Sequence, residues 1–533
     1  MPHARANFAL LLAAMVGFTA GCSGDGSRDP SIGGTGGGSF TEDTAAGAGA
    51  GEGTGGGGGG TPDANSDDSL ASRAGGDPAA TGGENNGGQF SLPDCASNAP
   101  MLAFYFSADD SNSMASPAIA REELNAKRAP DGTRIRTHEF LNYYNVHYPL
   151  KDPNDPTLGV FWEMHPHPSA EGSAEVRYRL QIGVQAPKAN RESMVLTFVV
   201  DASGSLVGPG IERARAAILS VADQLQPGDV INVVKWATED SVLLKSYSAT
   251  GTQADKLKLA EVVSKLSPGG GSDLHSGLLK GYELAAEKFD KTKINRVVLI
   301  SDGGANIGVL DRDIIAAAAE KAEGEGIYMA GIGVGPAQGY SDNLMDLVTD
   351  AGRGAYVYVD SNEEAQSLFK TRFEEIMMVA ARNVQVQIDL PSYLEIEKFY
   401  GEKYSSDPAK IEPQNLAPND SMVFNEILVL KNPPAACGQD TITVKVTWET
   451  PISHEPKENS VPPISLFDLM STETSPQMAR GNAIITYAEA LKLGDTLTLQ
   501  NAVKELGDAA ATAGNADLTD LASLLQQHPN WKP

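Results

Sequence analysis

A short oxygen-rich string that follows one apolar run is the part of this chain best suited to chemistry. The run Val195–Val200 ends at Asp201, and Ser203 and Ser205 follow at alternate positions. A turn at Gly204 would aim one carboxylate and two hydroxyls at a single hard cation, which prefers oxygen ligands. The string alone is a weak signal, because Asp and Ser are ordinary turn and helix-cap residues.

Two later segments add oxygen ligands at the same expected place. Ser272 follows three glycines and precedes a predicted helix, and Asp302 directly follows the apolar run 296–301. In open α/β sheets, ligands bind outside the carboxyl ends of the strands, which is also where Asp201 lies. The joint occurrence predicts a site for Mg²⁺ or Mn²⁺, which take about six oxygen ligands. Its five predicted metal residues are Asp201, Ser203, Ser205, Ser272 and Asp302.

Alternating strands and helices must position these residues. Between Ser193 and Val379, near-continuous apolar runs are separated by amphipathic stretches, which predicts a doubly wound, mostly parallel sheet covered on both faces. We expect strands at 195–200, 230–236, 242–247, 296–301, 327–334 and 355–359, with 242–247 at an edge. We expect helices at 211–224, 254–266, 278–289, 314–323, 344–351 and 363–379.

Together the five residues resemble the metal-ion-dependent adhesion site of the von Willebrand factor type A fold, which is Rossmann-like. The resemblance implies that Ser203 and Ser205 coordinate the ion directly and that Ser272 does so directly or through water. It implies that Asp201 and Asp302 act largely through hydrogen bonds and waters. Ser272 stands where the family usually has Thr, which keeps the hydroxyl but loses the methyl that restricts its rotamer. The implied partner is a protein that presents an acidic side chain to the ion.

The flanks of this domain show strand alternation and then helical spacing. Period-two patterns at 159–163, 175–184, 384–388, 423–430 and 442–446 predict an antiparallel β-sandwich in which the α/β domain is inserted. Helices are expected at 118–126 and 137–144, and again after Ser475, at 484–491 and 518–525. The stretch from Phe106 through Asp109 and Asp110 to Pro149 resembles the N-terminal region of bacterial YfbK-like lipoproteins. With the flanks, the resemblance covers about Met101 to Leu430.

The N-terminus has the features of an exported, tethered protein. A weakly basic start, an apolar run and the string Thr19-Ala-Gly-Cys22 predict a signal peptide. Cys22 resembles a lipobox cysteine, although Thr19 stands where Leu is usual; an ordinary cleavable signal is the alternative. Ser23 after the cysteine resembles lipoproteins of the Gram-negative outer membrane, so we expect a lipid-anchored protein of the cell envelope. The Gly-rich stretch 23–89 predicts a flexible tether.

The expected organisation has six parts. They are a lipoprotein signal peptide (1–22), a disordered tether (23–89), an N-terminal flanking region (90–190), a type A domain (191–380), a β-rich region (381–470) and a helical region (471–533). Cys95 and Cys437 are candidates for one disulfide across the inserted domain, and two free thiols are the alternative.

Charge and motif content separate the function classes. A net charge of -28, from 69 acidic against 41 basic residues, argues against nucleic acid as a partner. A serine hydrolase using Ser203, His275 and Asp273 or Asp302 is the weakest alternative, because Gly-x-Ser-x-Gly is absent. We therefore expect no enzyme but a binding module, with a structural envelope protein stabilised by its metal as the second reading.

Two further groups of polar residues have a simpler explanation than metal binding. His165-Pro-His167 lacks a third ligand in the sequence and is expected at a bend between strands. Asp109 and Asp110 are expected in a polar turn.

Overall fold

A computed structural model of the chain describes residues 92–109, 112–168, 175–324, 326–431, 436–470, 473–513 and 515–533. The predicted signal peptide with Cys22, the predicted tether 23–89 and Asp110 lie outside these described residues. Within the described ranges, no helix is both long enough and apolar enough to cross a lipid bilayer.

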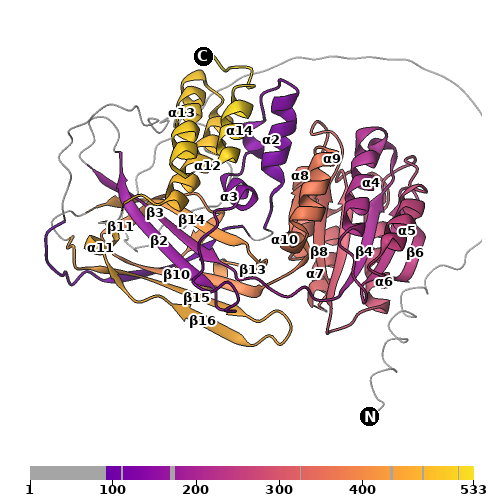
Figure 1. Cartoon of the computed structure of the whole chain (residues 1–533), viewed down its shortest axis with the longest axis horizontal. Coiled ribbons are helices and arrows are strands. Elements are labelled where there is room, and N and C mark those ends of the chain that lie inside the picture. Colours follow the sequence, from indigo (N-terminus) through magenta and orange to yellow (C-terminus); the bar gives the residue numbers. More distant parts are fainter. Residues whose placement is uncertain are drawn as a thin grey trace, which may run out of the picture. The chain divides into compact units, whose positions relative to one another are not determined.

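Six strands form the sheet at the centre of the inserted domain (Figure 1). They are β4 (Met194–Asp201), β5 (Val230–Trp236), β6 (Ser241–Ser248), β7 (Ile294–Ser301), β8 (Tyr328–Gly333) and β9 (Tyr356–Tyr358). Their spatial order is β6-β5-β4-β7-β8-β9. The edge strand β6 is antiparallel to β5, and the other neighbours are parallel. This confirms the predicted mostly parallel sheet.

Helices cover both faces of this sheet. Side chains alternate along β4, so successive residues pack in different cores. Leu196 and Phe198 pack with helices α4, α5 and α10 in one core, whereas Val199 packs with α6, α7 and α8 in the other. The helices are α4 (Pro209–Ala222), α5 (Gln253–Val263), α6 (Leu274–Glu287), α7 (Arg312–Gly324), α8 (Asp342–Ala351), α9 (Asn362–Gln366) and α10 (Phe373–Met377).

The predicted continuous closing helix at 363–379 is wrong. The chain forms α9, then a π-helical turn over Ser367–Thr371, and then α10. The break lies at Arg372, whose guanidinium donates to the backbone oxygen of Tyr143 in the flanking region, 3.1 Å away. A contact with a residue so distant in sequence leaves no trace in the local periodicity.

The flanking strands form two antiparallel sheets that share one core. One sheet has the order β12-β1-β10-β15-β16, with β13 paired to β10 and β17 to β15, and the other has the order β11-β14-β3-β2. The first contains β1 (Met101–Ser107), β10 (Ala381–Pro391), β12 (Lys403–Ser405), β13 (Gln414–Leu416), β15 (Thr441–Glu449), β16 (Pro456–Ser460) and β17 (Ile464–Ser465). The second contains β2 (Gly159–His167), β3 (Val176–Gln185), β11 (Leu394–Phe399) and β14 (Ser421–Leu430). Since β3 precedes the α/β domain and β10 follows it, the domain is inserted in this sandwich, as predicted.

The bend expected at His165-Pro-His167 does not exist. These residues end β2, and Pro166 lies opposite Tyr178 of β3. Because β2 is at the edge of its sheet, a proline without an N–H group removes no hydrogen bond to a second neighbour.

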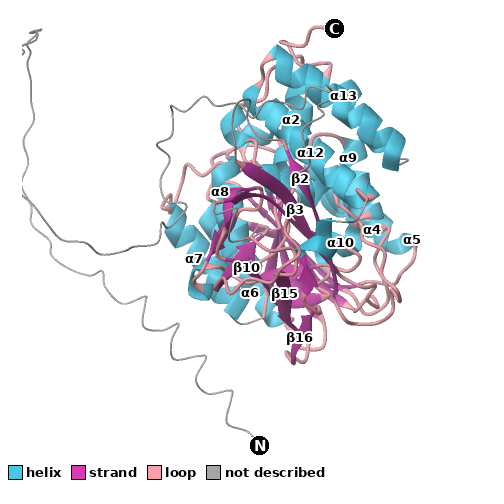
Figure 2. Ribbon diagram, turned by 90° about the vertical axis from the view of Figure 1, so that its left-hand side faces the viewer, coloured by secondary structure: helices cyan, strands magenta, loops and turns pink. Residues whose placement is uncertain are grey.

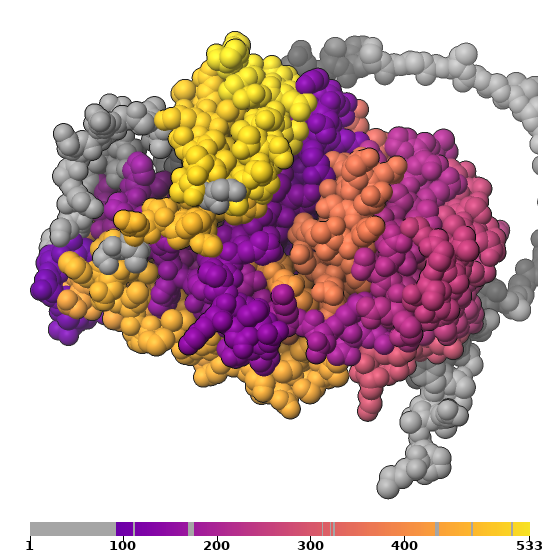
Figure 3. Space-filling model, viewed as in Figure 1, coloured from indigo at the N-terminus to yellow at the C-terminus, as the bar shows by residue number. Residues whose placement is uncertain are grey.

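A helical layer built from both ends of the described chain covers the second sheet. Its helices are α2 (Ala115–Asn125), α3 (Thr137–Tyr144), α12 (Pro476–Leu493), α13 (Thr496–Ala513) and α14 (Ala516–Leu525). The short helix α11 (Leu466–Met470) packs in the sandwich core instead, through Leu466 and Leu469. Phe140 of α3 and Ile484 of α12 share a core with Val423 and Ile427 of β14. Figure 2 shows α12 and α13 beside α2, and in Figure 3 the yellow C-terminal part lies against the indigo N-terminal flanking part. The helical C-terminal segment is therefore confirmed, with α13 as a helix that the two predicted stretches did not include.

Ion pairs join the flanking helices to the inserted domain. Arg121 of α2 lies 2.7 Å from Asp360, which follows β9. Arg136, directly before α3, lies 2.6 Å from Asp342 in the first turn of α8. All four side chains are largely buried, so these pairs fix how α2 and α3 contact the domain.

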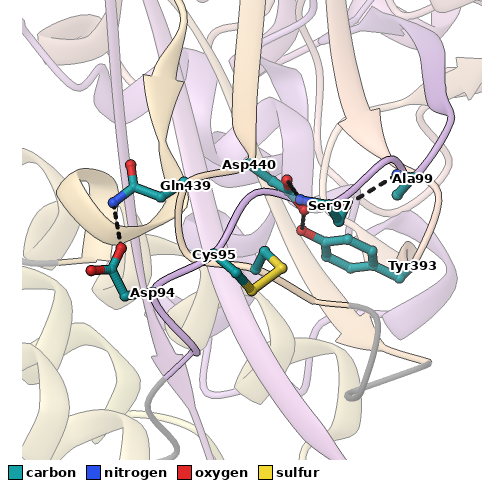
Figure 4. The surroundings of a disulfide bond; sticks show 8 residues. Asp94, Cys95, Ser97, Ala99, Tyr393, Gln439 and Asp440 are labelled. Carbon is teal, nitrogen blue, oxygen red and sulfur yellow. Dashed lines mark hydrogen bonds between the residues drawn. A yellow bond between two sulfur atoms is a disulfide. The ribbon is translucent and has the colours of Figure 1, made fainter.

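A disulfide joins Cys95 to Cys437, 342 positions later (Figure 4). Beside it, the Asp440 carboxylate accepts hydrogen bonds from the Ser97 amide, the Ser97 hydroxyl and the Tyr393 hydroxyl, each 2.6 Å long. The bridge and these bonds tie the beginning of the described chain to the strand region that follows the inserted domain.

Glu426 is an unusual residue of the sandwich core. It lies on β14 between Phe424 and Leu428, which both face this core, and it is fully buried. Neither of its side-chain oxygens has a hydrogen-bond partner in the described part of the chain. Burial therefore raises the pKa of Glu426 well above its ordinary value of 4.5.

Replacing Glu426 tests this assignment through the pH dependence of stability. Since the unfolded chain loses this proton above pH 4.5 and the folded chain keeps it, wild-type stability falls as pH rises above 4.5. We expect Glu426→Gln to remove that slope, and Glu426→Met to raise the free energy of unfolding at pH 7 by about 1–3 kcal/mol. Urea denaturation at several pH values measures both. A wild-type slope that persists in Glu426→Gln would contradict the assignment.

Candidate metal centre

The parallel strands β4 and β7 bring the first and last parts of the predicted site together. Val200 of β4 is paired with Ile300 of β7, so Asp201 and Ser301 end adjacent strands at one edge of the sheet. Asp302 is the next residue. The predicted placement of these residues outside the carboxyl ends of the strands therefore agrees with the fold.

Two backbone hydrogen bonds join the serine string to the glycine-rich loop before α6. The Gly204 amide donates to the oxygen of Gly270 over 3.1 Å, and the Gly269 amide donates to the oxygen of Ala202 over 2.9 Å. Gly270 has a φ of 83°, and a Cβ there would lie 2.6 Å from the Thr238 hydroxyl. A glycine is thus required where the loop approaches the site.

Asp201 is fixed by hydrogen bonds to both carboxylate oxygens. Its Oδ1 accepts from the Ser203 amide at 2.8 Å, and its Oδ2 accepts from the Ser301 hydroxyl at 2.7 Å. The carboxylate is fully buried. Ser301 was not among the predicted site residues, although it is the polar end of a strand that was predicted.

The hydroxyls of Ser203 and Ser205 are neighbours. Their Oγ atoms lie 3.0 Å apart, with Ser203 buried and Ser205 exposed. A 3₁₀ turn over Gly204–Leu206 produces this arrangement. The pair therefore offers two neighbouring oxygen ligands, of which that of Ser205 belongs to an exposed residue.

Ser272 is held by the loop that follows Asp302. The Ser272 amide donates to the side-chain oxygen of Asn306 at 2.8 Å, and the Ser272 oxygen accepts from the amides of Asn306 and Ile307 at 3.0 and 3.1 Å. Ser272 is buried. Asn306 was not among the predicted site residues; its position four residues beyond the Asp302 carboxylate was the available signal.

Hydroxyls and backbone amides, rather than ion pairs, hold the two carboxylates in the structure described. Asp302 is also buried, and its Oδ1 accepts from the Gly304 amide at 3.0 Å. Burial, and then the negative charge of Asp302, raise the pKa of Asp201 to about 7. Two buried carboxylates that destabilise each other, beside three serines, are a donor set that suits a divalent cation. The residues present therefore fit Mg²⁺ or Mn²⁺.

The hydrogen bonds of the described residues do not form a hydrolase triad. Ser203 Oγ contacts Ser205 Oγ, and Asp273 Oδ1 accepts from the Ser276 amide as the N-cap of α6. Neither bond involves His275. These bonds therefore do not form the proposed triad of Ser203, His275 and an aspartate.

A second polar cluster lies in the flanking region. Potential ligand atoms of Asp109, His138 and Glu139 lie within 4.8 Å of one another. Both carboxylates are already occupied by N–H donors: those of Ser113 and Asn142 for Asp109, and those of Ser116 and Arg136 for Glu139. The guanidinium of Arg136 beside Glu139 would also repel a cation. The cluster is explained as a buried hydrogen-bond network, and sequence reasoning missed His138 and Glu139.

His165 has a partner that sequence reasoning did not consider. Its Nε2 lies 2.5 Å from Glu163, which also accepts from the Ser475 amide. Glu163 therefore connects β2 to the start of α12, and His165 contacts the same carboxylate.

Comparisons with known proteins agree with the fold of the inserted part. Residues 196–371 match the family model of the von Willebrand factor type A domain. The chain is 26% identical to the protein YfbK of Escherichia coli (strain K12) over 300 residues, which are 54% of this chain and 50% of YfbK. It is 22% identical to the protein sll0103 of a Synechocystis strain over 380 residues, which are 67% of this chain and 87% of that protein.

A solved structure of a von Willebrand factor type A protein from Catenulispora acidiphila is also similar. It has a TM-score of 0.45 and 14% identity, and the match covers 71% of this chain and 91% of that one. The alignment with YfbK spans half the length of that relative.

The raised pKa of Asp201 predicts a pH effect that depends on metal. Without divalent cations, the folded chain keeps a proton on Asp201 that the unfolded chain loses above pH 3.8, so stability falls between about pH 4 and pH 7. In EDTA we expect Asp201→Asn to lack this slope and to melt above wild type at pH 8. With Mg²⁺ at pH 8 we expect the order to reverse, because only wild type gains stability from binding. Thermal melting in the two buffers measures this, and parallel pH profiles in EDTA would show that Asp201 titrates normally.

Proposed function

Because residues 196–371 are a von Willebrand factor type A domain, we propose that the chain binds a protein partner through a divalent cation. The ion, Mg²⁺ or Mn²⁺, is held by Asp201, Ser203, Ser205, Ser272 and Asp302. Domains of this family are commonly metal-dependent interaction modules. The observation that carries the proposal is the pair of serine hydroxyls 3.0 Å apart, next to a buried aspartate whose pKa is raised to about 7.

The three serines and the two aspartates have different roles in this proposal. Ser203 and Ser205 provide neutral oxygens at the open side, and Ser272 provides a third from the loop that Asn306 holds. Asp201 and Asp302 supply negative charge from the buried side of the site, where their hydrogen bonds hold them in place. A bound Mg²⁺ would supply a positive centre with a position open to one more oxygen ligand. An acidic side chain of a partner is the ligand with matching charge.

Exposed apolar side chains lie in the loops that contain the site residues, and they favour a protein as the ligand. Val207 is 65% exposed and lies two residues after Ser205, and Leu310 is 54% exposed in the loop after β7. Ile307 is 38% exposed and covers Gly271, since a Cβ on that glycine would lie 2.0 Å from Ile307 Cδ1. These three side chains, here called the apolar rim, would contact the residues on either side of a partner's carboxylate.

We propose further that the chain is exported and anchored by a lipid on Cys22 at the outer membrane of a Gram-negative envelope. The signal-like start, the small residues before Cys22 and Ser23 after it support this. The Gly-rich stretch 23–89 would then give the domain reach from the membrane surface. A cell-envelope location also suits the disulfide, which persists in oxidising compartments.

A structural role for the metal is the second candidate. It is favoured by the depth of the carboxylates, since an ion there would stabilise the loops even without a partner. Chelation that lowers the melting temperature but releases no bound protein would support this candidate over the first.

The metal assignment is tested by Ser203→Ala together with Ser205→Ala. Removing both hydroxyls should abolish detectable Mg²⁺ binding in titration calorimetry, because two direct oxygen ligands are lost. The control is Ser241→Ala with Ser248→Ala, which changes two exposed serines of the edge strand β6 in the same domain. Unchanged Mg²⁺ affinity in the first variant, or an equal loss in both, would show that the ion binds elsewhere.

The apolar rim is tested by Val207→Ser together with Ile307→Ser. We expect this variant to bind Mg²⁺ within about twofold of wild type and to capture much less of the EDTA-releasable protein from envelope extracts, since contact area around the carboxylate is lost. Leu257→Ser, at a site that is 66% exposed on α5, is the matched control. Capture is quantified by mass spectrometry. Equal capture by wild type, the rim variant and Leu257→Ser would show that the apolar rim does not contact the partner.

A further inference from the structure

The loop between β8 and α8 is held by residues of the N-terminal flanking region. Glu122 of α2 accepts the amide hydrogen of Ala337 through its Oε2, over 3.2 Å. Arg134, in the turn between α2 and α3, donates through Nη1 to the oxygen of the same residue, over 3.0 Å. Both backbone groups of one loop residue are thus bound by side chains from about 200 positions earlier in the chain.

Glu122 also reaches this loop through Arg213 of α4. Arg213 Nη2 lies 3.0 Å from Glu122 Oε1, and Arg213 Nη1 donates to the oxygen of Gly335. The two charged side chains are only 12% and 18% exposed, so the pair is partly desolvated and its loss would leave a poorly solvated charge. Tyr358 adds a third contact, because its hydroxyl lies 2.7 Å from the Gly335 oxygen and also contacts Glu122.

The same loop packs against the back of the proposed metal centre. Gly335 has a φ of 110°, and a Cβ placed there would lie 3.2 Å from Asp302 Cβ and 4.0 Å from Leu206 Cδ2. Asp302 is a proposed metal residue, and Leu206 follows Ser205 directly. The Ser341 amide, near the end of the loop, donates to the backbone oxygen of Asp302 over 2.9 Å. The loop therefore contacts both the carboxylate side and the serine side of the site.

We propose that Glu122 is a positioning residue for the metal centre, so that the flanking region sets the metal affinity of the inserted domain. Glu122 and Arg213 hold residues 335–337 against Asp302 and Leu206. This contact keeps the distance between the Asp302 carboxylate and the Ser203 and Ser205 hydroxyls fixed. Release of Glu122 lets the loop move away, and the ligands then spend more time apart. This inference rests on the proposed function, since it concerns the affinity of that same site.

The coupling works in both directions, because linkage between two equilibria is reciprocal. If the contact of Glu122 with the loop strengthens metal binding, then bound Mg²⁺ strengthens that contact by the same factor. Metal and partner binding at one end of the sheet would thus strengthen the contact between α2 of the flanking region and the loop.

The test compares three variants of the full chain by Mg²⁺ titration calorimetry and thermal melting. Glu122→Ala removes the contacts with the Ala337 amide, Arg213 and Tyr358 and should weaken Mg²⁺ binding about tenfold, as is usual for groups that orient metal ligands. Glu122→Gln keeps an acceptor for the Ala337 amide but loses the charge facing Arg213, so a smaller loss is expected. The control Asp360→Asn removes the charge that faces Arg121, the neighbouring residue of α2, and keeps both hydrogen bonds to the Ala337 backbone. It should bind Mg²⁺ within about twofold of wild type.

Hydrogen exchange gives a second measurement that a general loss of stability would not reproduce. We expect Mg²⁺ to slow exchange of the Ala337 amide in wild type and in Asp360→Asn, and to have little effect on it in Glu122→Ala. Mg²⁺ affinities that fall equally in Glu122→Ala and Asp360→Asn, or that change in neither, would overturn the inference. If wild type itself bound no Mg²⁺, the proposed function would fail, which is a separate outcome.

Discussion

The parallel pairing of β4 with β7 is the constraint on which the rest of the structure depends. It places Asp201 and Ser301 at adjacent strand ends and brings Asp302 beside them, so two carboxylates are buried without a neutralising ion pair in the described chain. Burial of like charges is costly unless a cation or a proton relieves it, and the pKa of Asp201, raised to about 7, expresses that cost. The loops that contain Ser203, Ser205 and Ser272 are arranged around these carboxylates by backbone hydrogen bonds and need no further charged group.

The insertion of the domain in a β-sandwich has a physical consequence for this site. Strands before and after the domain belong to the same two sheets, and the disulfide between Cys95 and Cys437 joins the two flanks again. Both ends of the inserted segment are therefore anchored, and α2 and α3 contact it through buried ion pairs at Asp360 and Asp342. The loop behind Asp302 lies at that boundary. The inserted domain is therefore supported by residues outside its own segment.

Local patterns predicted elements well where burial on one side decided them. Helix 137–144 was placed at its observed ends, and the weak apolar run at 242–247 was placed at the sheet edge, where β6 lies. The errors lie where tertiary packing adds to the local pattern. Arg372, at the break of the closing helix, donates to Tyr143 of the flanking region, and Pro166 is accommodated in β2 because that strand has one neighbour. The helix α13 packs against the two helices that the apolar stretches marked.

The sequence by itself determined which residues could bind a metal and at which strand ends they lie, because side-chain chemistry and the alternation of strands and helices are local properties. It also marked the cysteines that the structure joins. Only the tertiary structure decided how those ligands are held: by Ser301 on Asp201, Asn306 on Ser272, and Glu122 with Arg213 on the loop behind Asp302. These supporting contacts join residues up to about 200 positions apart, and their side chains are ordinary surface types. Their roles depend on burial and distance, which exist only after the chain has folded.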